Sequence, residues 1–385
     1  MHIVHVLTRL TKGGSEENTM ATATWQAQAG HSVTVIHGGA ADRLWETRWP
    51  AGVERIALPD LVAPLSPRLD WSAQQKLRAL YLTMQPDIVH THQSKAGILG
   101  RRAARAVPKA RVVHGIHIVN FDHVPRARKA LYLTAERHAA RATDAFVGVS
   151  DAVCDAYVEA GIARSRDVYC VPSGFDLARF RSGEPPQDAA DLLGTPDSAA
   201  RPFCIAMLAA LEPRKGHLAF LDSFARWFSG RRDVRLLVCG EGPMRAAIEQ
   251  VAKTPQLRHS VVMCGHRSDP EAILVLADVS VLASEREGLP RAALQSIAAG
   301  TPVVMPNFPG CEAVFTDQGN ARLVNRNAPD ALCAALSGLE TERPMLRKLS
   351  VGARATDLRD WEEDRLGRDT TAIYETLIER AETAA

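Results

Sequence analysis

The sequence has few aromatic residues, few cysteines and no long apolar segment. Of its 385 residues, 5% are aromatic. Its cysteines are scattered without a C-x-x-C pair, at Cys154, Cys170, Cys204, Cys239, Cys264, Cys311 and Cys333. Several fall within predicted buried strands, where cysteine behaves as a small hydrophobic residue. This usage disfavours a disulfide framework and favours a reducing compartment, so we expect a cytoplasmic protein.

Apolar runs in the sequence are short. None approaches the roughly 20 residues that a bilayer-spanning helix requires. The run at the N-terminus, Met1 to Leu7, is too short for a signal peptide and has no cleavage-site pattern. Any contact with a membrane is therefore expected to be peripheral, at its inner face.

An excess of one charge sign is also missing. Lys and Arg number 46 and Asp and Glu 44, for a formal net charge of +2, which gives no electrostatic basis for binding nucleic acid. The first half is locally basic, with Arg101, Arg102, Arg105, Lys109, Arg111, Arg126, Arg128 and Lys129. These cations are either solvated helix faces or a surface for an anionic membrane or a phosphorylated acceptor.

The chain length and the order of predicted elements indicate two α/β domains. A chain of 385 residues exceeds the usual size of a single core. Strands alternate with helices from His2–Leu7 onward and again after residue 201, which is typical of doubly wound parallel sheets. We expect a first domain over 1–180, a Pro- and Gly-rich linker over 181–201, a second domain over 202–360, and a C-terminal helix over 361–385 that packs back on the first domain.

The stretch 279–302 predicts a strand, an acidic loop, a helix and a glycine stop. Pro290 suits the first position of the helix, and Gly300 ends it. Glu287 and Gly288 are thereby predicted at the carboxyl end of a strand and beside a helix N-terminus. Open α/β sheets bind ligands at this position, and the helix dipole favours anions there.

Gln295 lies about one and a half turns into this helix, roughly 8 Å along its axis. One elongated ligand could therefore contact Glu287 at one end and Gln295 further along. The alternative is that Gln295 is a solvated helix residue and Glu287 a simple cap.

Two more loops are predicted at the same edge of the second sheet. Arg214 and Lys215 follow the strand 203–208 and precede a helix, where a phosphate would meet both N–H groups and positive charge. The segment G-E-G-P, which contains Gly242, follows the strand 234–239, although a lone G-x-G is a weak signal. Because parallel strands end at one edge, we expect these loops to lie beside the Glu287 loop.

In the first half, Gly13 and Gly14 follow the first strand, with Ser15 as the expected N-cap of the next helix. Glycines there let a backbone approach a ligand closely, or simply form a tight turn. The loop has no G-x-G-x-x-G, which argues against a nicotinamide or flavin site.

Histidines are frequent in the first half, at His90, His92, His114, His117 and His123. They lack H-E-x-x-H or a similar metal-ligand spacing, so we expect no metal site. His114 ends a predicted strand, 111–114, and faces the expected ligand edge. This position makes His114 the best polar candidate near a reacting centre.

Together these motifs resemble the family 4 retaining glycosyltransferases (glycosyltransferases group 1). The resemblance in the second half is carried by S-E-R-E-G-L-P-R-A-A-L-Q-S-I-A-A-G-T-P-V-V, with P-R-K-G-H before it and P-G-C-E-A-V after it. In the first half it is carried by T-K-G-G-S-E, P-D-I-V-H-T-H, V-V-H-G-I-H and V-P-S-G-F-D. It covers most of the chain. It implies a GT-B fold, in which two Rossmann-like domains face each other across a cleft, the second holding a nucleotide-sugar donor and the first an acceptor.

The resemblance also implies roles for single residues. Glu287 matches a glutamate that contacts hydroxyls of the transferred sugar. Gln295 stands where a second glutamate grips the ribose, so weaker ribose binding or a changed nucleotide preference is implied. Lys215 matches a lysine on the donor diphosphate, and Ala210 replaces the arginine that accompanies it. His114 matches a histidine near the anomeric carbon.

The implied catalytic residues are His114, Lys215 and Glu287. The implied donor-binding residues are Gly13, Gly14, Arg214, Lys215, Gly242, Glu287, Gly288, Leu289 and Gln295.

The expected reaction transfers a sugar, with retention, from a nucleotide diphosphate sugar to an acceptor hydroxyl. A UDP-sugar is the expected donor, and a lipid-linked or cell-surface polysaccharide precursor the expected acceptor. The resemblance implies that the reaction needs no metal and no cofactor. Lys215, Arg214, a helix N-terminus and the Gly13-Gly14 loop would instead stabilise the leaving diphosphate. Two alternatives stay open: a sugar-nucleotide-binding protein weakened in catalysis, as Ala210 and Gln295 suggest, and a sugar-nucleotide epimerase with the same two-domain layout.

Overall fold

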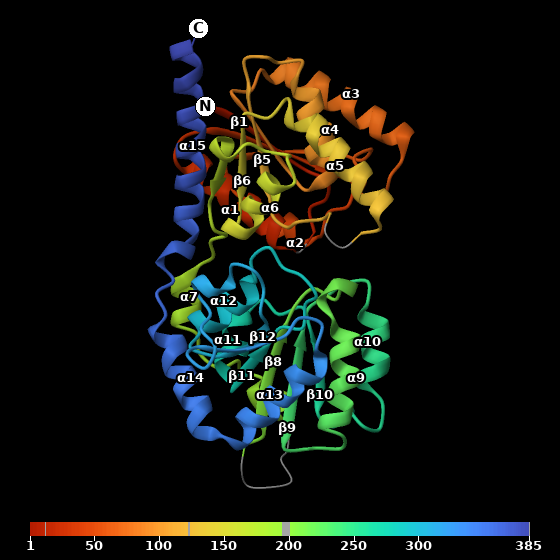
Figure 1. Cartoon of the computed structure of the whole chain (residues 1–385), viewed down its shortest axis with the longest axis vertical. Coiled ribbons are helices and arrows are strands. Elements are labelled where there is room, and N and C mark those ends of the chain that lie inside the picture. The colour runs from red at the N-terminus through yellow and green to blue at the C-terminus, as the bar shows by residue number, and fades with distance from the viewer. Residues whose placement is uncertain (12, 122–123, 195–200, 385) are drawn as a thin grey trace. The chain divides into compact units, whose positions relative to one another are not determined.

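The computed structural model describes residues 1–11, 13–121, 124–194 and 201–384, and the chain divides into two units (Figure 1). Unit 1 comprises Met1–Gly174 and Asp360–Ala385, and unit 2 comprises Phe175–Arg359. The predicted linker 181–201 is therefore not a separate segment: its residues 181–194 belong to unit 2, and residues 195–200 lie outside the described part. Asp188 binds Arg267 there, at 2.7 Å, which explains how a Pro- and Gly-rich stretch packs on a domain.

Unit 1 is built on a parallel sheet in the order β3-β2-β1-β4-β5-β6-β7. Its strands are β1 (His2–Leu7), β2 (Ser32–Gly38), β3 (Val53–Leu58), β4 (Ile88–His92), β5 (Arg111–Ile116), β6 (Ala145–Gly148) and β7 (Val168–Cys170). Its longer helices are α1 (Gly14–Gln28), α3 (Pro67–Met84), α4 (Ser94–Ala104), α5 (Arg126–Ala140), α6 (Asp151–Glu159) and α15 (Glu363–Ala384). The sheet is covered on both faces, which explains why its strands read as nearly continuous apolar runs.

Alternate residues of the unit 1 strands face two different helical layers. On one face, Val4 and Val6 pack with α3 and α4. On the other, Ile3 packs with α15. The helices α1 and α15 lie side by side (Figure 1). A Cβ at Gly367 would overlap the side chain of Trp25, so glycine permits their close approach.

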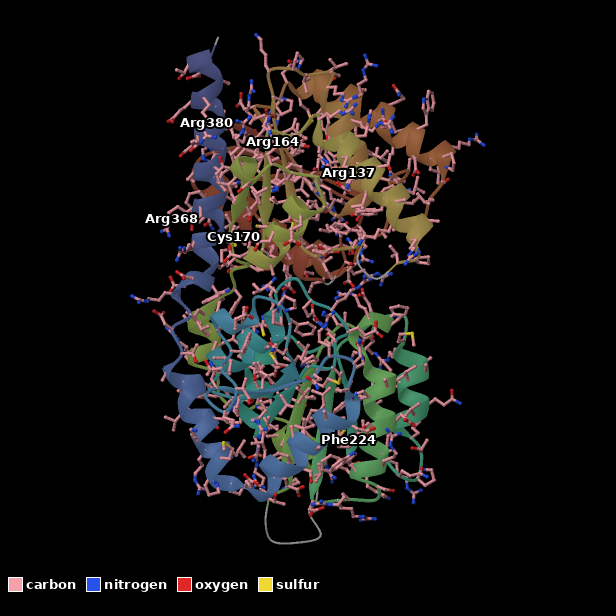
Figure 2. The ribbon with its side chains drawn as sticks, in the orientation of Figure 1. Arg137, Arg164, Cys170, Phe224, Arg368 and Arg380 are labelled. Carbon is pink, nitrogen blue, oxygen red and sulfur yellow. The ribbon has the colours of Figure 1, made fainter. Side chains whose placement is uncertain are left out.

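Unit 2 has a second parallel sheet, in the order β10-β9-β8-β11-β12-β13. Its strands are β8 (Phe203–Leu208), β9 (Val234–Cys239), β10 (Val261–Gly265), β11 (Val279–Val281), β12 (Val303–Pro306) and β13 (Ala321–Val324). Its helices are α7 (Leu177–Arg181), α8 (Ala189–Leu193), α9 (His217–Trp227), α10 (Arg245–Ala252), α11 (Pro270–Leu276), α12 (Arg291–Ala298), α13 (Pro329–Thr341) and α14 (Arg343–Ala355). Phe224 of α9, labelled in Figure 2, is fully buried, and its ring stacks on Phe228 with centroids 4.5 Å apart.

The strand order reverses once in each sheet. The reversal lies between β1 and β4 in unit 1, and between β8 and β11 in unit 2. The predicted fold class, two doubly wound Rossmann-like domains, is confirmed. In such sheets ligands bind outside the carboxyl ends of the strands at the reversal, so the loops after β8 and β11 are where unit 2 is expected to bind one.

Several local predictions differ from the structure. α1 begins at Gly14 with Gly13 as its N-cap, and the Ser15 hydroxyl donates to the Glu16 carboxylate instead of capping the backbone. Pro290 is the N-cap of α12 and not its first residue, because its ψ of 73° is not helical. Within the described ranges, we find no helix long and apolar enough to cross a bilayer.

Candidate functional site

Three loops of unit 2 meet at the carboxyl edge of its sheet. They follow β8, β9 and β11 and span 209–216, 240–244 and 282–290. The Leu211 amide donates to the Glu241 carbonyl at 2.8 Å, and the Glu285 amide donates to the Arg214 carbonyl at 2.9 Å. These backbone bonds join the three loops into one surface, as the sequence predicts.

An ion pair spans the reversal point of this sheet. Lys215 Nζ, from the loop after β8, lies 2.5 Å from Glu287 Oε1, from the loop after β11. The Lys215 side chain is 14% exposed and that of Glu287 9%, so the pair is largely shielded from water. Arg214 lies beside it, with Nη1 3.6 Å from Glu287 Oε2 and Nε donating to Glu212 at 3.0 Å. Two cations and two carboxylates therefore converge where a ligand is expected.

Gly216 is the residue that lets these two loops approach. Its φ is +71°, and a Cβ there would overlap the Ala283 carbonyl oxygen. Gly242 has a similar part in the third loop, because a Cβ there would lie 2.6 Å from the Leu211 carbonyl oxygen. The glycines of this edge are thus needed for loop packing.

We expect Gly216→Ala to lower the free energy of unfolding by at least about 2 kcal/mol, because a left-handed backbone costs an L-residue about 1–2 kcal/mol before any overlap. Urea denaturation followed by circular dichroism measures this. The matched control is Gly338→Ala in α13, where a Cβ meets nothing within 4 Å and alanine should stabilise the helix by about 1 kcal/mol. Equal effects of the two substitutions would contradict this role for Gly216.

The remaining predicted donor-binding residues of unit 2 lie in the loop after β11 and in α12, but among the described residues Gln295 is not hydrogen-bonded to the ion pair. Gly288 and Leu289 are half-buried in the loop before α12, and Gln295 is half-buried in the second turn of that helix. Across the part of the chain that the structure describes, no hydrogen bond joins the Gln295 side chain to Lys215 or Glu287.

Sequence reasoning missed three polar side chains at this edge. His217, Ser284 and Arg286 each have a buried polar atom with no hydrogen-bond partner in the described ranges. Burial, with Lys215 nearby, lowers the pKa of His217 to about 4, so its ring is neutral. Buried polar atoms without partners are rare in native proteins, and their presence here indicates a place for ligand atoms. Their position between a buried strand and a helix was the sequence signal that could have found them.

In unit 1, the glycine loop is filled by a carboxylate. A Cβ at Gly13 would lie 2.7 Å from Glu16 Oε2, and Thr11 Oγ1 donates to Glu16 Oε1 at 2.9 Å. Glu16 is 1% exposed and lies at the N-terminus of α1, where negative charge is favoured. Gly13 thus makes room for Glu16, and Gly14 is the first residue of α1.

His114 does not lie where the sequence predicted. β5 continues to Ile116, so His114 is inside the strand and 2% exposed. Its Nδ1 lies 3.0 Å from Thr91 Oγ1, and its ring packs beneath Gly97 of α4. Burial, and then Arg101, hold its pKa well below the usual range. His117, after the strand end, is half-buried, and His123 lies outside the described residues.

Comparison with known proteins covers both units. The family described as Glycosyl transferases group 1 matches residues 196–356, and the family described as Glycosyltransferase Family 4 matches residues 12–179. The UDP-Gal:alpha-D-GlcNAc-diphosphoundecaprenol alpha-1,3-galactosyltransferase of Escherichia coli is 28% identical over 308 residues, which are 78% of each chain. The GDP-mannose-dependent alpha-(1-6)-phosphatidylinositol dimannoside mannosyltransferase of Mycobacterium tuberculosis is 26% identical over 87% of this chain and 85% of its own.

Among solved structures, HepE of Anabaena in complex with UDP and glucose is similar over 98% of this chain and 100% of its own, with a TM-score of 0.76 and 18% identity. At this level of identity the likeness shows a shared fold.

Proposed function

The chain belongs to the group 1 glycosyl transferases of glycosyltransferase family 4, and from this membership we propose that it transfers a sugar from a nucleotide diphosphate sugar to an acceptor hydroxyl with retention of configuration. The observation that carries the proposal is the Lys215–Glu287 pair, 2.5 Å apart, across the reversal point of the unit 2 sheet. It combines a phosphate-binding cation with a carboxylate that can accept hydrogen bonds from sugar hydroxyls.

The proposed mechanism uses residues of unit 2 for the leaving group. When a donor binds, Lys215 and Arg214 turn from Glu287 to the diphosphate and stabilise the negative charge that grows on it. Glu287, freed from its cations, orients the hydroxyls of the transferred sugar. The acceptor hydroxyl attacks the same face that the diphosphate leaves, and a phosphate oxygen takes its proton. In this proposal the side-chain cations supply the positive charge, without a metal or cofactor.

His114 has a different proposed part from the one its motif implies. Its ring is buried beside Thr91. We propose that this ring supports the end of β5, where Ile116 and His117 lie, and that it does not contact the donor while that end of the sheet is closed.

A UDP-sugar is the proposed donor. The name of the Escherichia coli relative contains UDP-Gal, and the Anabaena structure holds UDP. The mycobacterial relative is GDP-mannose-dependent, so a GDP-sugar is the second candidate. Gln295, which replaces a glutamate in the family pattern, is the position at which we expect nucleotide preference to differ.

The proposed reaction is tested by incubating the chain with UDP- and GDP-sugars and measuring nucleotide release with and without a lipid-linked sugar acceptor. Release that depends on the acceptor supports transfer. Calorimetric binding of a nucleotide sugar without turnover would instead support a binding protein, and conversion of the donor sugar without acceptor would support an epimerase. Failure of every nucleotide sugar to bind contradicts all three.

We propose a lipid-linked acceptor, reached at the inner face of a membrane. Both relatives named above have lipid-linked sugars in their names. On unit 1, large apolar side chains are exposed: Leu65 is 80% exposed, Trp71 68% and Leu131 64%. α3 packs on α4 and α4 on α5 (Figure 1), and Arg126 at the start of α5 is exposed. Apolar and basic side chains together suit an anionic interface.

We expect the double variant Trp71→Ser, Leu131→Ser to bind anionic vesicles at least about tenfold more weakly, because a large side chain that enters the interface contributes about 1.5–3 kcal/mol. Co-sedimentation with vesicles, with and without anionic lipid, measures this. The control is Trp227→Ser on α9 of unit 2, where the side chain is 44% exposed. If the double variant binds vesicles as tightly as the control and the parent chain do, this surface is not the membrane contact.

A further inference from the structure

Unit 1 contains a cluster of buried histidines from two neighbouring strands. His5 of β1 is in register with His90 of β4, and His92 lies two residues further along β4, so all three face one side of the sheet. They are 0%, 3% and 3% exposed. One ligand atom from each lies within 4.8 Å of the others. The face is the one covered by α1 and α15, opposite to His114.

Gly115 of β5 provides the space for this cluster. It is in register with His92. A Cβ at Gly115 would lie 2.8 Å from His92 Nδ1 and 3.1 Å from His90 Nε2. Any residue with a side chain would therefore press against both imidazoles, and glycine leaves room for the rings of His90 and His92.

Buried side chains of the two covering helices hold the outer nitrogens of the His5 and His90 rings. His5 Nε2 lies 2.8 Å from Gln26 Oε1 of α1, and His90 Nδ1 lies 2.5 Å from the Tyr374 hydroxyl of α15. Gln26 is itself fixed, because its Nε2 donates to Thr371 Oγ1 at 3.1 Å. Metal-binding histidines commonly hold their second nitrogen in this way, which fixes the tautomer and the ring orientation.

The inner nitrogens have the spacing of ligands. His5 Nδ1 lies 3.0 Å from His92 Nε2, close to the distance of about 3.3 Å between two nitrogens of a tetrahedral zinc site. Burial lowers the pKa of His5 to about 4, so the ring is neutral and has a lone pair. Without an ion, His5 and His92 share a proton, and His90 Nε2 stays buried with no hydrogen-bond partner among the residues described.

We propose that His5, His90 and His92 bind a divalent transition metal ion, for which Zn²⁺ is the best match to three imidazole ligands. The ion would join β1 to β4 and, through Gln26 and Tyr374, both strands to α1 and α15. Its part is structural and concerns unit 1. Lys215 and Glu287 belong to unit 2, so the proposed ion takes no part in the proposed transfer reaction.

The test uses the full chain without an affinity tag. Because the cluster is buried, the chain is refolded in the presence of Co²⁺ or Zn²⁺, dialysed, and analysed for metal content and for the visible spectrum of bound Co²⁺. We expect about one equivalent per chain and a higher midpoint of thermal unfolding with metal than without, since binding to the native state stabilises it.

Variants assign the site. We expect His90→Gln and His92→Gln to lose the bound ion, and Tyr374→Phe to weaken its affinity about 10- to 100-fold. The control His114→Gln removes a buried histidine from the other face of the same sheet and should keep the ion. Circular dichroism checks that each variant is folded. Substoichiometric metal in the natively refolded parent chain overturns the proposal, whatever the variants do, and so does full metal content in folded His90→Gln and His92→Gln.

Discussion

Lys215→Ala is expected to lower kcat for sugar transfer by about 10² to 10³, the usual cost of losing one preorganised group that stabilises charge in a transition state. Lys215 Nζ is 2.5 Å from Glu287 and lies at the loop-to-helix turn that would meet the leaving diphosphate. The measurement is nucleotide release at saturating donor. The control is Lys253→Ala, at the exposed end of α10, which should keep the parent rate.

Glu287→Ala should separate kcat from KM. Without the Glu287 carboxylate, Lys215 loses its ion-pair partner and Arg214 keeps only Glu212. Lys215 is then free to bind diphosphate, so we expect KM for the donor to fall or stay unchanged. The sugar is no longer oriented, so kcat falls by a similar factor of about 10² to 10³. If Lys215→Ala and Glu287→Ala both leave kcat unchanged, the site is wrongly assigned.

Glu136→Leu is expected to lower the free energy of unfolding by about 3–5 kcal/mol, because it leaves a buried charge without its partner. Arg101 Nη2 lies 2.5 Å from Glu136 Oε2, and both side chains are fully buried. Arg101→Met should be as severe. The double variant should recover most of the loss, since an apolar pair of similar volume removes both desolvation costs.

Urea denaturation followed by circular dichroism measures these differences. The control is Arg102→Met, the exposed neighbour on the same helix, which should change stability little. Additive losses in the double variant, or a single-variant loss as small as that of Arg102→Met, would contradict a buried pair.

The ion pair of Arg101 shows why charge is hard to place from sequence. Arg101 and Arg102 are adjacent and chemically identical, and both were expected among the surface cations of the first half. Only the packing of α4 against α5 decides that Arg101 points inward to Glu136, which is 35 residues away. No local pattern reports a partner at that separation.

The strands were predictable because a buried parallel strand is a continuous apolar run. β1 and β8, for example, have the predicted bounds, His2–Leu7 and Phe203–Leu208. The shared edge of the Lys215 and Glu287 loops followed from the same strands, since parallel strands end together. The histidine cluster could not be found in this way. His5 stands in an ordinary strand, and its closeness to His92 depends on the register of β1 and β4.

The course of the chain between the two units has a consequence for synthesis on the ribosome. Unit 1 begins at Met1 and is completed by the segment Asp360–Ala385, with unit 2 inserted between. Every residue of unit 2 has therefore been translated before α15 has been made. Domains usually fold in N-to-C order during synthesis, but here unit 2 can complete its fold first. Until α15 has been made, the face of unit 1 that packs against it, which includes the partners of Tyr374, stays uncovered. The segment that completes unit 1 is thus translated after all of unit 2.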